Sequence, residues 1–205
     1  MLRRTSRVPP LRYTRHVSRP AVFIDRDGTL IEESGYLNEL SRLIFFPFTV
    51  DAVRQLNRGG FAVVVITNQA GIARGIVTES FLATAHQHIQ ERMSAGGAHI
   101  DAFYHCPHHP DGTIAALRTT CDCRKPLPGL ITRAAADLHL DLSRSFTIGD
   151  RLKDVEAGRA AGTRTVLVRT GYGAADEKDQ TGIVTPDAVA DNLAGAAAWV
   201  LHSQV

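Results

Sequence analysis

The sequence predicts an α/β protein built on a doubly wound parallel sheet. Short, mostly apolar runs alternate along the chain with segments of helical periodicity. Strands that alternate with helices form parallel β-α-β units, so helices are expected on both faces of the sheet. In such sheets, ligands bind at the carboxyl ends of the strands. Functional residues should therefore directly follow the strands.

Six short runs are expected to form the strands. The second, FAVVVI, is continuously apolar, as expected for a strand that is buried on both faces. The first ends abruptly at Asp25. In chain order the expected strands are Ala21–Ile24 and residues 61–66, 102–105, 145–148, 165–168 and 188–189.

Five segments have the features of helices. Gly59 and Gly60 end the first, Thr78 is a suitable N-cap for the second, and Pro128 opens the third. The expected helices are residues 48–57, 78–95, 128–138 and 151–161, and a last one from residue 191 onward. The long segment between the third strand and the third helix is expected to be irregular.

The composition favours one domain. The chain has 205 residues, of which 44% are hydrophobic, and this suffices for one sizeable core but not for two. A formal net charge of +2 gives no overall field that would recruit nucleic acid or an acidic membrane. Residues 1–19 are rich in arginine and lack acidic residues and apolar periodicity. We expect them to be a flexible basic arm, followed by a single domain at residues 20–205.

Targeting and redox signals favour a cytoplasmic protein without a membrane partner. No apolar run of a secretory signal follows the arm, and its prolines favour a flexible tail over the amphipathic helix of a transit peptide. No stretch approaches the roughly 18 apolar residues of a membrane span. All three cysteines lie close together, which favours a metal site in a reducing compartment over a disulfide framework.

Polar groups follow three of the strands and the irregular segment. These groups are DRDGT at residues 25–29, TNQ at 67–69, RK at 124–125 and GDR at 149–151. Because the carboxyl ends of parallel strands meet at one edge of a sheet, the four groups are expected to converge there.

The chemistry of these groups is that of phosphoryl transfer. Asp25, Asp27 and Asp150 would bring three carboxylates together, which is unfavourable unless a hard cation such as Mg²⁺ neutralises them. Lys125 and the Thr67 hydroxyl would donate to phosphate oxygens. Taken singly, each residue has an ordinary explanation: an aspartate after a strand is usually a turn former or a helix cap, and a lysine is usually solvated. The four groups together favour the functional interpretation.

The four groups resemble the signature of the haloacid dehalogenase superfamily of phosphatases. That signature is D-x-D-G-T, then T or S, then K, then G-D-x-x-x-D, and it stands here at residues 25–29, Thr67, Lys125 and residues 149–154. The resemblance implies a Rossmann-like hydrolase core. It also implies a Mg²⁺-dependent phosphoric monoester hydrolase that works through an aspartyl-phosphate intermediate.

The resemblance implies a role for each residue. Asp25 would be the nucleophile, and Asp27 would be the general acid and then the general base. Thr67 and Lys125 would steady the phosphoryl group. Mg²⁺ would be held by the carboxylates of Asp25 and Asp150 and by the backbone carbonyl of Asp27.

A second metal site is expected in the irregular segment. Cys106, His108, Cys121 and Cys123 would supply three thiolates and one imidazole, a closed tetrahedral set for a structural Zn²⁺. His109 is the competing imidazole, and three free cysteines in a loop are the alternative. A zinc ion would cross-link and stabilise this irregular loop of some 20 residues.

Within the superfamily, the chain is similar to the heptose bisphosphate phosphatase branch, with the histidinol-phosphate phosphatase branch as near kin. The runs CPHHP and GIARG resemble the heptose branch, whereas Leu30-Ile31 resembles the histidinol branch. The heptose branch implies hydrolysis of the 7-phosphate of a heptose 1,7-bisphosphate, in the synthesis of lipopolysaccharide or nucleotide-heptose precursors. The alternative is histidinol phosphate or another small phosphate ester.

The resemblance also implies the substrate contacts. Arg124 would recognise the second phosphate or the sugar. The expected contacts are Glu33, Ser34, Gly35, Tyr36, Thr67, Asn68, Gln69, Ala70, Arg124 and Lys125. Only 20 residues separate Asp27 from the next expected helix, so the cap domain of many superfamily members does not fit. An open, capless monomer is expected, and residues 169–173 also lie at its substrate edge.

A function of another class is a nucleic-acid-associated protein. Its support is the arginine-rich arm and a D-x-D-G-T run that also resembles polynucleotide 3′-phosphatases. The rest of the chain has no basic stripe with interleaved aromatic residues, so the phosphatase acting on a phosphorylated sugar, without nucleic acid, is preferred.

Overall fold

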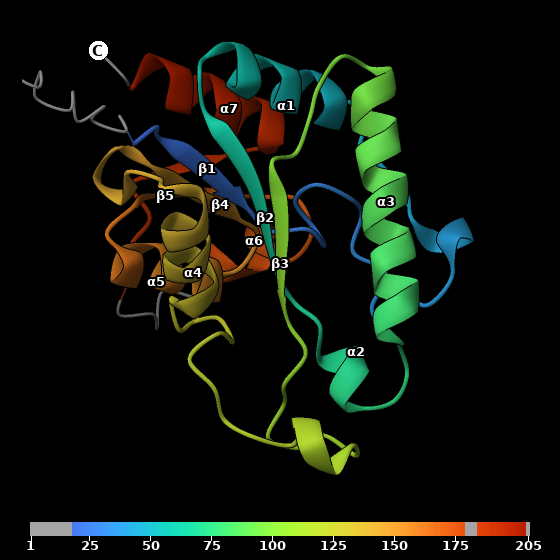
Figure 1. Ribbon diagram of the computed structural model, residues 1–205. Helices are drawn as coiled ribbons and strands as arrows, with labels where there is room; N and C mark the ends of the chain where they lie inside the picture. The colour runs from blue at the N-terminus through green and yellow to red at the C-terminus, as the bar shows by residue number, and fades with distance from the viewer. Residues whose placement is uncertain (1–17, 179–183, 204–205) are drawn as a thin grey trace, which may run out of the picture.

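A six-stranded parallel sheet forms the centre of the computed structural model, which describes residues 18–178 and 184–203 (Figure 1). The strand order is β3-β2-β1-β4-β5-β6, and every neighbouring pair is parallel. The strands are β1 (Ala21–Ile24), β2 (Ala62–Asn68), β3 (Ala102–Cys106), β4 (Phe146–Gly149), β5 (Arg164–Val168) and β6 (Ala188–Ala190). The predicted fold class, a doubly wound Rossmann-like α/β sheet, is confirmed.

Helices cover both faces of this sheet. They are α1 (Thr49–Arg58), α2 (Ala70–Ala73), α3 (Glu79–Ala95), α4 (Gly129–Leu138), α5 (Leu152–Ala161), α6 (Gly173–Asp176) and α7 (Leu193–His202). Side chains of α1, α3 and α7 join one apolar core, and those of α4 and α5 join the other. Because side chains alternate along a strand, Val22 of β1 packs in the first core and Phe23 in the second.

The predicted helices and strands are confirmed, with boundaries that differ by at most two residues. β2 runs on to Asn68, because its last residues still pair with β3. Thr78 is the N-cap of α3, and its hydroxyl accepts a hydrogen bond of 3.1 Å from the N–H of Phe81. The prediction misses α2 and α6, whose four residues each are too few to show a periodicity.

Two long connections contain little regular structure. The connection from β1 to α1 holds only the 3-10 helix η1 (Leu40–Arg42), and that from β3 to α4 holds only η2 (Ala115–Leu117). A third such helix, η3 (Leu142–Arg144), precedes β4. The first connection therefore carries no inserted cap domain, as expected.

The strand order determines where a ligand can bind. The chain passes outward from β1 to β2 and β3, returns to β4 on the other side of β1, and continues outward. The winding thus reverses between β1 and β4. A crevice opens at such a point beyond the carboxyl ends of the strands.

The basic arm lies almost wholly outside the described residues. The division into an arm at residues 1–19 and a domain at residues 20–205 therefore stays a prediction. Arg19 forms a parallel β-bridge with Leu140 and an ion pair with Asp101. Among the helices of the described part, none combines the length and the apolar character needed to cross a bilayer.

Candidate active site

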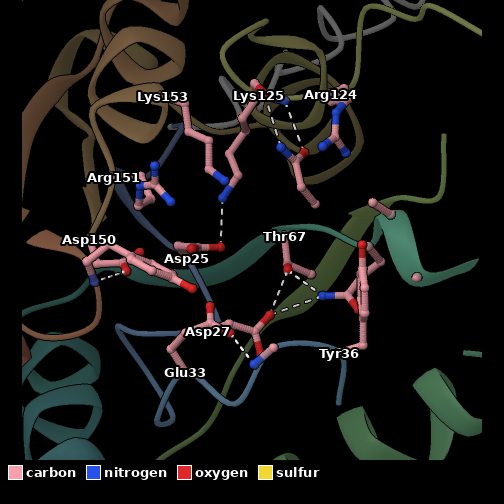
Figure 2. A pocket seen from close by; sticks show the side chains of 16 residues that line it. Asp25, Asp27, Glu33, Tyr36, Thr67, Arg124, Lys125, Asp150, Arg151 and Lys153 are labelled. Carbon is pink, nitrogen blue, oxygen red and sulfur yellow. Dashed lines mark hydrogen bonds and ion pairs between the residues drawn. The ribbon is translucent and has the colours of Figure 1, made fainter. Parts of the chain in front are cut away.

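A cavity of about 310 Å³ opens at the carboxyl ends of β1, β2 and β4 (Figure 2). Asp25, Asp27, Thr67, Lys125 and Asp150 all contribute to its lining. The residues that were expected to carry the chemistry are therefore brought together, although they come from four separate segments of the chain.

Lys125 is a buried ammonium group at the base of this cavity. Its Nζ lies 2.7 Å from Asp25 Oδ1 and 2.7 Å from Asp154 Oδ1, and it donates to the carbonyl of Ile66 at 3.0 Å. Burial alone would lower the pKa of Lys125, but the charges of Asp154 and Asp25 outweigh burial and raise it. The side chain of Asn68 bonds both the N–H and the carbonyl of Lys125, at 3.0 Å each. Lys125 is thus charged and fixed in place.

Three carboxylates crowd around this lysine. Oxygens of Asp25, Asp150 and Asp154 lie within 4.8 Å of one another. Burial, reinforced by the charges of Asp25 and Asp154, raises the pKa of Asp150 to about 8. When all three carboxylates are ionised, they and the ammonium carry a net charge of two negative units, which a divalent cation would neutralise. Mg²⁺ prefers carboxylate oxygens, so the residues present fit it.

The carboxylates differ in their other partners. Among the described residues, Asp25 Oδ2 accepts no hydrogen bond, and Asp150 accepts one from the N–H of Tyr172 at 2.8 Å. Asp154 accepts from the N–H of Arg151 at 3.1 Å and contacts Lys125. Asp154, which is missing from the predicted ligand set, is therefore engaged by the protein, whereas Asp25 and Asp150 have oxygens free for a cation. The ligand set itself stays a prediction.

The Asp27 side chain points away from these three carboxylates. It pairs with Arg26, whose Nε and Nη2 lie 3.1 and 2.9 Å from its oxygens. Gln69 Nε2 donates to Asp27 Oδ2 at 3.1 Å and to Thr67 Oγ1 at 2.8 Å (Figure 2). The Asp27 carboxylate therefore has an environment separate from that of the three carboxylates, and the Asp27 backbone carbonyl as a metal ligand stays a prediction.

The predicted substrate contacts line the cavity, with one exception. Of the ten expected residues, all but Ser34 contribute to the wall. The carbonyl of Ser34 instead accepts a hydrogen bond from Arg42, which ties the loop together. Burial raises the pKa of Glu33 on this wall, and the charges of Asp27 and Asp25 add to the effect.

The four expected zinc ligands form one cluster. Cys121 Sγ lies 3.5 Å from Cys106 Sγ and 3.2 Å from Cys123 Sγ, and His108 Nδ1 lies 3.8 and 3.4 Å from the sulfurs of Cys106 and Cys123. A tetrahedral site with Zn–S of about 2.3 Å and Zn–N of about 2.0 Å has edges of roughly 3.5–3.8 Å. His109 has a different partner, because its Nδ1 accepts from the N–H of Asp111. The cluster fits Zn²⁺ closely.

Comparison with known proteins identifies the family. The HAD-hydrolase-like family model matches residues 122–196, which include Lys125 and Asp150. The chain is 40% identical over 187 residues to the D-glycero-beta-D-manno-heptose-1,7-bisphosphate 7-phosphatase of Yersinia pestis and 42% identical over 187 residues to that of Escherichia coli K12. These alignments cover 91% of this chain and 92% and 90% of those proteins. The chain belongs to the haloacid dehalogenase-like phosphatases.

Solved structures agree with the family. The D,D-heptose 1,7-bisphosphate phosphatase from B. bronchiseptica, complexed with magnesium and phosphate, matches this phosphatase with a TM-score of 0.80 and 31% identity, over 90% of this chain and 99% of that one. The D,D-heptose 1,7-bisphosphate phosphatase from Burkholderia thailandensis matches with a TM-score of 0.65 and 27% identity, over 89% and 99%. Magnesium in the first structure supports the cation that the carboxylates here require.

Four further residues of this phosphatase line the cavity without having been expected there as contacts: Gly71, Arg151, Lys153 and Tyr172. Arg151 pairs with Asp176 at 3.0 Å and stacks over the Tyr172 ring at 4.6 Å. Arg151 directly follows the G-D motif, and Tyr172 lies in the segment after β5 that was expected at this edge. No sequence feature could have placed Lys153 at the cavity, because Lys153 lies within an ordinary helical pattern.

Proposed function

We propose that the protein is a Mg²⁺-dependent phosphatase that hydrolyses the 7-phosphate of D-glycero-D-manno-heptose 1,7-bisphosphate through an aspartyl-phosphate intermediate. The observation that carries the proposal is the environment of Asp25. One of its oxygens is held by Lys125, and the other accepts no hydrogen bond from the described residues and belongs to the carboxylate group shared with Asp150. The names of the relatives support the choice of substrate.

The reaction needs two steps. In the first, Asp25 attacks phosphorus, the P–O bond to the sugar breaks, and Asp27 donates its proton to the departing oxygen. In the second, the Asp27 carboxylate takes a proton from water, whose oxygen attacks phosphorus and releases Asp25 and inorganic phosphate. Lys125 and the Thr67 hydroxyl donate to the phosphoryl oxygens. Bound by Asp25, Asp150 and the Asp27 carbonyl, Mg²⁺ would neutralise charge on the transferred group.

A doubly phosphorylated substrate is supported by the cations of the cavity wall. Arg124 lies on one side of the cavity, and Arg151 and Lys153 lie on the other (Figure 2). Lys153 forms no ion pair with the described residues, so its ammonium is available for an anionic ligand. Charge-assisted hydrogen bonds from such groups favour phosphate, and the absence of a cap leaves room for a sugar.

We further propose a structural Zn²⁺ on Cys106, His108, Cys121 and Cys123. The metal would hold the backbone two residues before Lys125. We propose a monomer, and free thiols in a metal-like cluster support the reducing cytoplasm. A role in supplying heptose precursors follows from the same substrate.

The test is phosphate release with Mg²⁺ from heptose 1,7-bisphosphate and from histidinol phosphate, for the wild type, Asp25→Asn and Asp137→Asn. Asp137 pairs with Tyr104 outside the cavity and serves as the matched control. Asp25→Asn should lose essentially all turnover, while the control keeps it. Equal turnover by Asp25→Asn and wild type would eliminate the nucleophile. A wild-type preference for histidinol phosphate would replace the proposed substrate.

A further inference from the structure

Arg26 is a buried charged side chain beside the reacting groups that has no assigned role. It stands between Asp25 and Asp27 in the sequence, and only 1% of it is exposed. Its Nε lies 3.1 Å from both oxygens of Asp27, and its Nη2 lies 2.9 Å from both. Each of the two N–H groups is thus shared between both carboxylate oxygens, and the carboxylate lies across the edge of the guanidinium.

The surroundings of Arg26 leave Asp27 as its single charged partner. Within the described part of the chain, no other carboxylate forms an ion pair with Arg26, and its Nη1 is buried without a hydrogen bond. The nearby His86 stacks on Phe103 with ring centroids 4.5 Å apart. Burial, followed by the charge of Arg26, lowers the pKa of His86 to about 3, so the imidazole is neutral. The positive charge of Arg26 is therefore directed at Asp27 alone.

Stability alone is a weak explanation for this pair. Removing two charged groups from water is costly, and apolar side chains in place of a buried ion pair often stabilise a protein equally well or better. What the guanidinium supplies is geometry, because two N–H groups that are each shared between both oxygens hold the carboxylate at a defined angle to the guanidinium plane. Gln69 donates to the same carboxylate at 3.1 Å from another side. Rotation of the Asp27 carboxylate is thereby restricted from two directions.

We propose that Arg26 is a positioning residue of the reaction. Its two N–H groups orient the Asp27 carboxyl group, which carries the proton taken from water in the second step of the preceding turnover, so that this proton can pass to the departing sugar oxygen. This inference rests on the proposed function, in which Asp27 is the general acid and base. The Asp27 side chain is 15% exposed and lines the cavity, so it can reach a ligand while Arg26 holds it from behind. Arg26 itself does not line the cavity and acts only through Asp27.

A positioning role for Arg26 predicts different effects on alkyl and aryl phosphates, whereas a purely structural role predicts the same effect on both. A sugar alkoxide is a poor leaving group and needs the proton of Asp27, whereas p-nitrophenolate is a stable anion and needs it much less. Correctly placed general acids contribute about 10²–10⁴-fold to the rate. The ratio kcat/KM reports only the steps up to the first irreversible one, here the formation of the aspartyl phosphate. Misplacing Asp27 should therefore reduce kcat/KM selectively for alkyl phosphates.

The experiment compares kcat/KM for heptose 1,7-bisphosphate and p-nitrophenyl phosphate in the wild type, Arg26→Met, Arg26→Lys and Thr147→Val. Arg26→Met should lower kcat/KM for the sugar phosphate at least about tenfold more than it lowers kcat/KM for the aryl phosphate. This difference is part of the rate contribution of a correctly placed general acid. Arg26→Lys keeps the charge, which guards against a failure to fold, but it offers a single point of contact and should restore only part of the loss. Thr147 is buried and bonds Thr163 outside the cavity, so Thr147→Val should affect both substrates equally.

Two results would overturn the inference. One is an equal loss of kcat/KM for both substrates in Arg26→Met. The other is a ratio of the two kcat/KM values that stays at the wild-type level in both Arg26 variants. Thermal unfolding of each variant shows whether a general loss comes from instability. A failure of the proposed function gives a different pattern. If the wild type hydrolyses histidinol phosphate but not the heptose, the substrate is wrong, and the same comparison is made with histidinol phosphate as the alkyl ester.

Discussion

Gly171 is expected to control the metal site although it carries no side chain. It follows β5 with φ of +57° and lies against the turn after β1. A Cβ at this position would lie 2.9 Å from Asp150 Cγ, closer still to Asp150 Oδ2, and 2.7 Å from the Cα of Gly28. Ordinary contacts begin at 3.4 Å. Gly171→Ala must therefore displace the Asp150 carboxylate or the Gly28 backbone.

The displacement sets the size of the effect. Restoring ordinary contacts requires a shift of more than half an ångström, and for the carboxylate oxygen a shift on the order of 1 Å, which in a reacting site costs about 10²-fold. The left-handed backbone conformation adds roughly 1 kcal/mol of destabilisation for alanine. We expect the Mg²⁺ concentration for half-maximal phosphate release to rise about 10- to 100-fold in Gly171→Ala, as estimated from this shift.

Gly162→Ala is the matched control for this prediction. Gly162 ends α5 with φ of +84°, so alanine there carries the same kind of backbone strain, but its Cβ would have nothing within 4 Å. Both variants should lose similar thermal stability, and only Gly171→Ala should change the Mg²⁺ dependence. If the two variants show the same Mg²⁺ titration of activity, close packing at Gly171 does not govern Asp150, and the reasoning is refuted.

Two further predictions concern the zinc cluster and the cavity wall. Cys121→Ser removes one of four clustered ligands, so metal analysis should find the zinc of the wild type lost, together with a lower unfolding temperature; full zinc retention would dismiss this ligand set. Arg124→Ala should raise KM for the bisphosphate roughly tenfold, since a charge-assisted hydrogen bond contributes about 1.5–3 kcal/mol. The KM of p-nitrophenyl phosphate, which has no second phosphate, should change little, and an equal rise for both substrates would contradict the assignment.

The fold could be predicted because its signals are local. FAVVVI is apolar at every position, and a strand of this kind must be covered on both faces, which only the helices of a parallel sheet provide. Thr78 also signals the start of α3 through its own hydroxyl. The four residues of α2 could not be predicted, because a single turn has no period and is held by its neighbours in space.

The candidate site could be predicted only where a motif carries it. Asp25 and Asp150 follow strands, and the sheet topology alone brings their ends together. The contact between Lys125 and Asp154 could not be predicted in this way, because it depends on how α5 packs beside a loop from another part of the chain. Arg26 occupies the variable position of the D-x-D motif, where an arginine would ordinarily be expected in solvent. Its burial results from tertiary packing and cannot be predicted from the hydrophobic periodicity of the sequence.

The separation of Asp25 from Asp27 would let two aspartates only two residues apart perform the different tasks proposed for them. Asp25 belongs to the group of three carboxylates and Lys125, whose net charge of two negative units in the fully ionised state a divalent cation would balance. Asp27 lies outside that group, and Arg26 balances its charge one to one. Carboxylates take different roles in one site when their environments differ in this way. A nucleophile that shares a cation with the phosphate and an acid–base group with its own counter-ion can then exchange protons and phosphoryl groups without competing for the same partner.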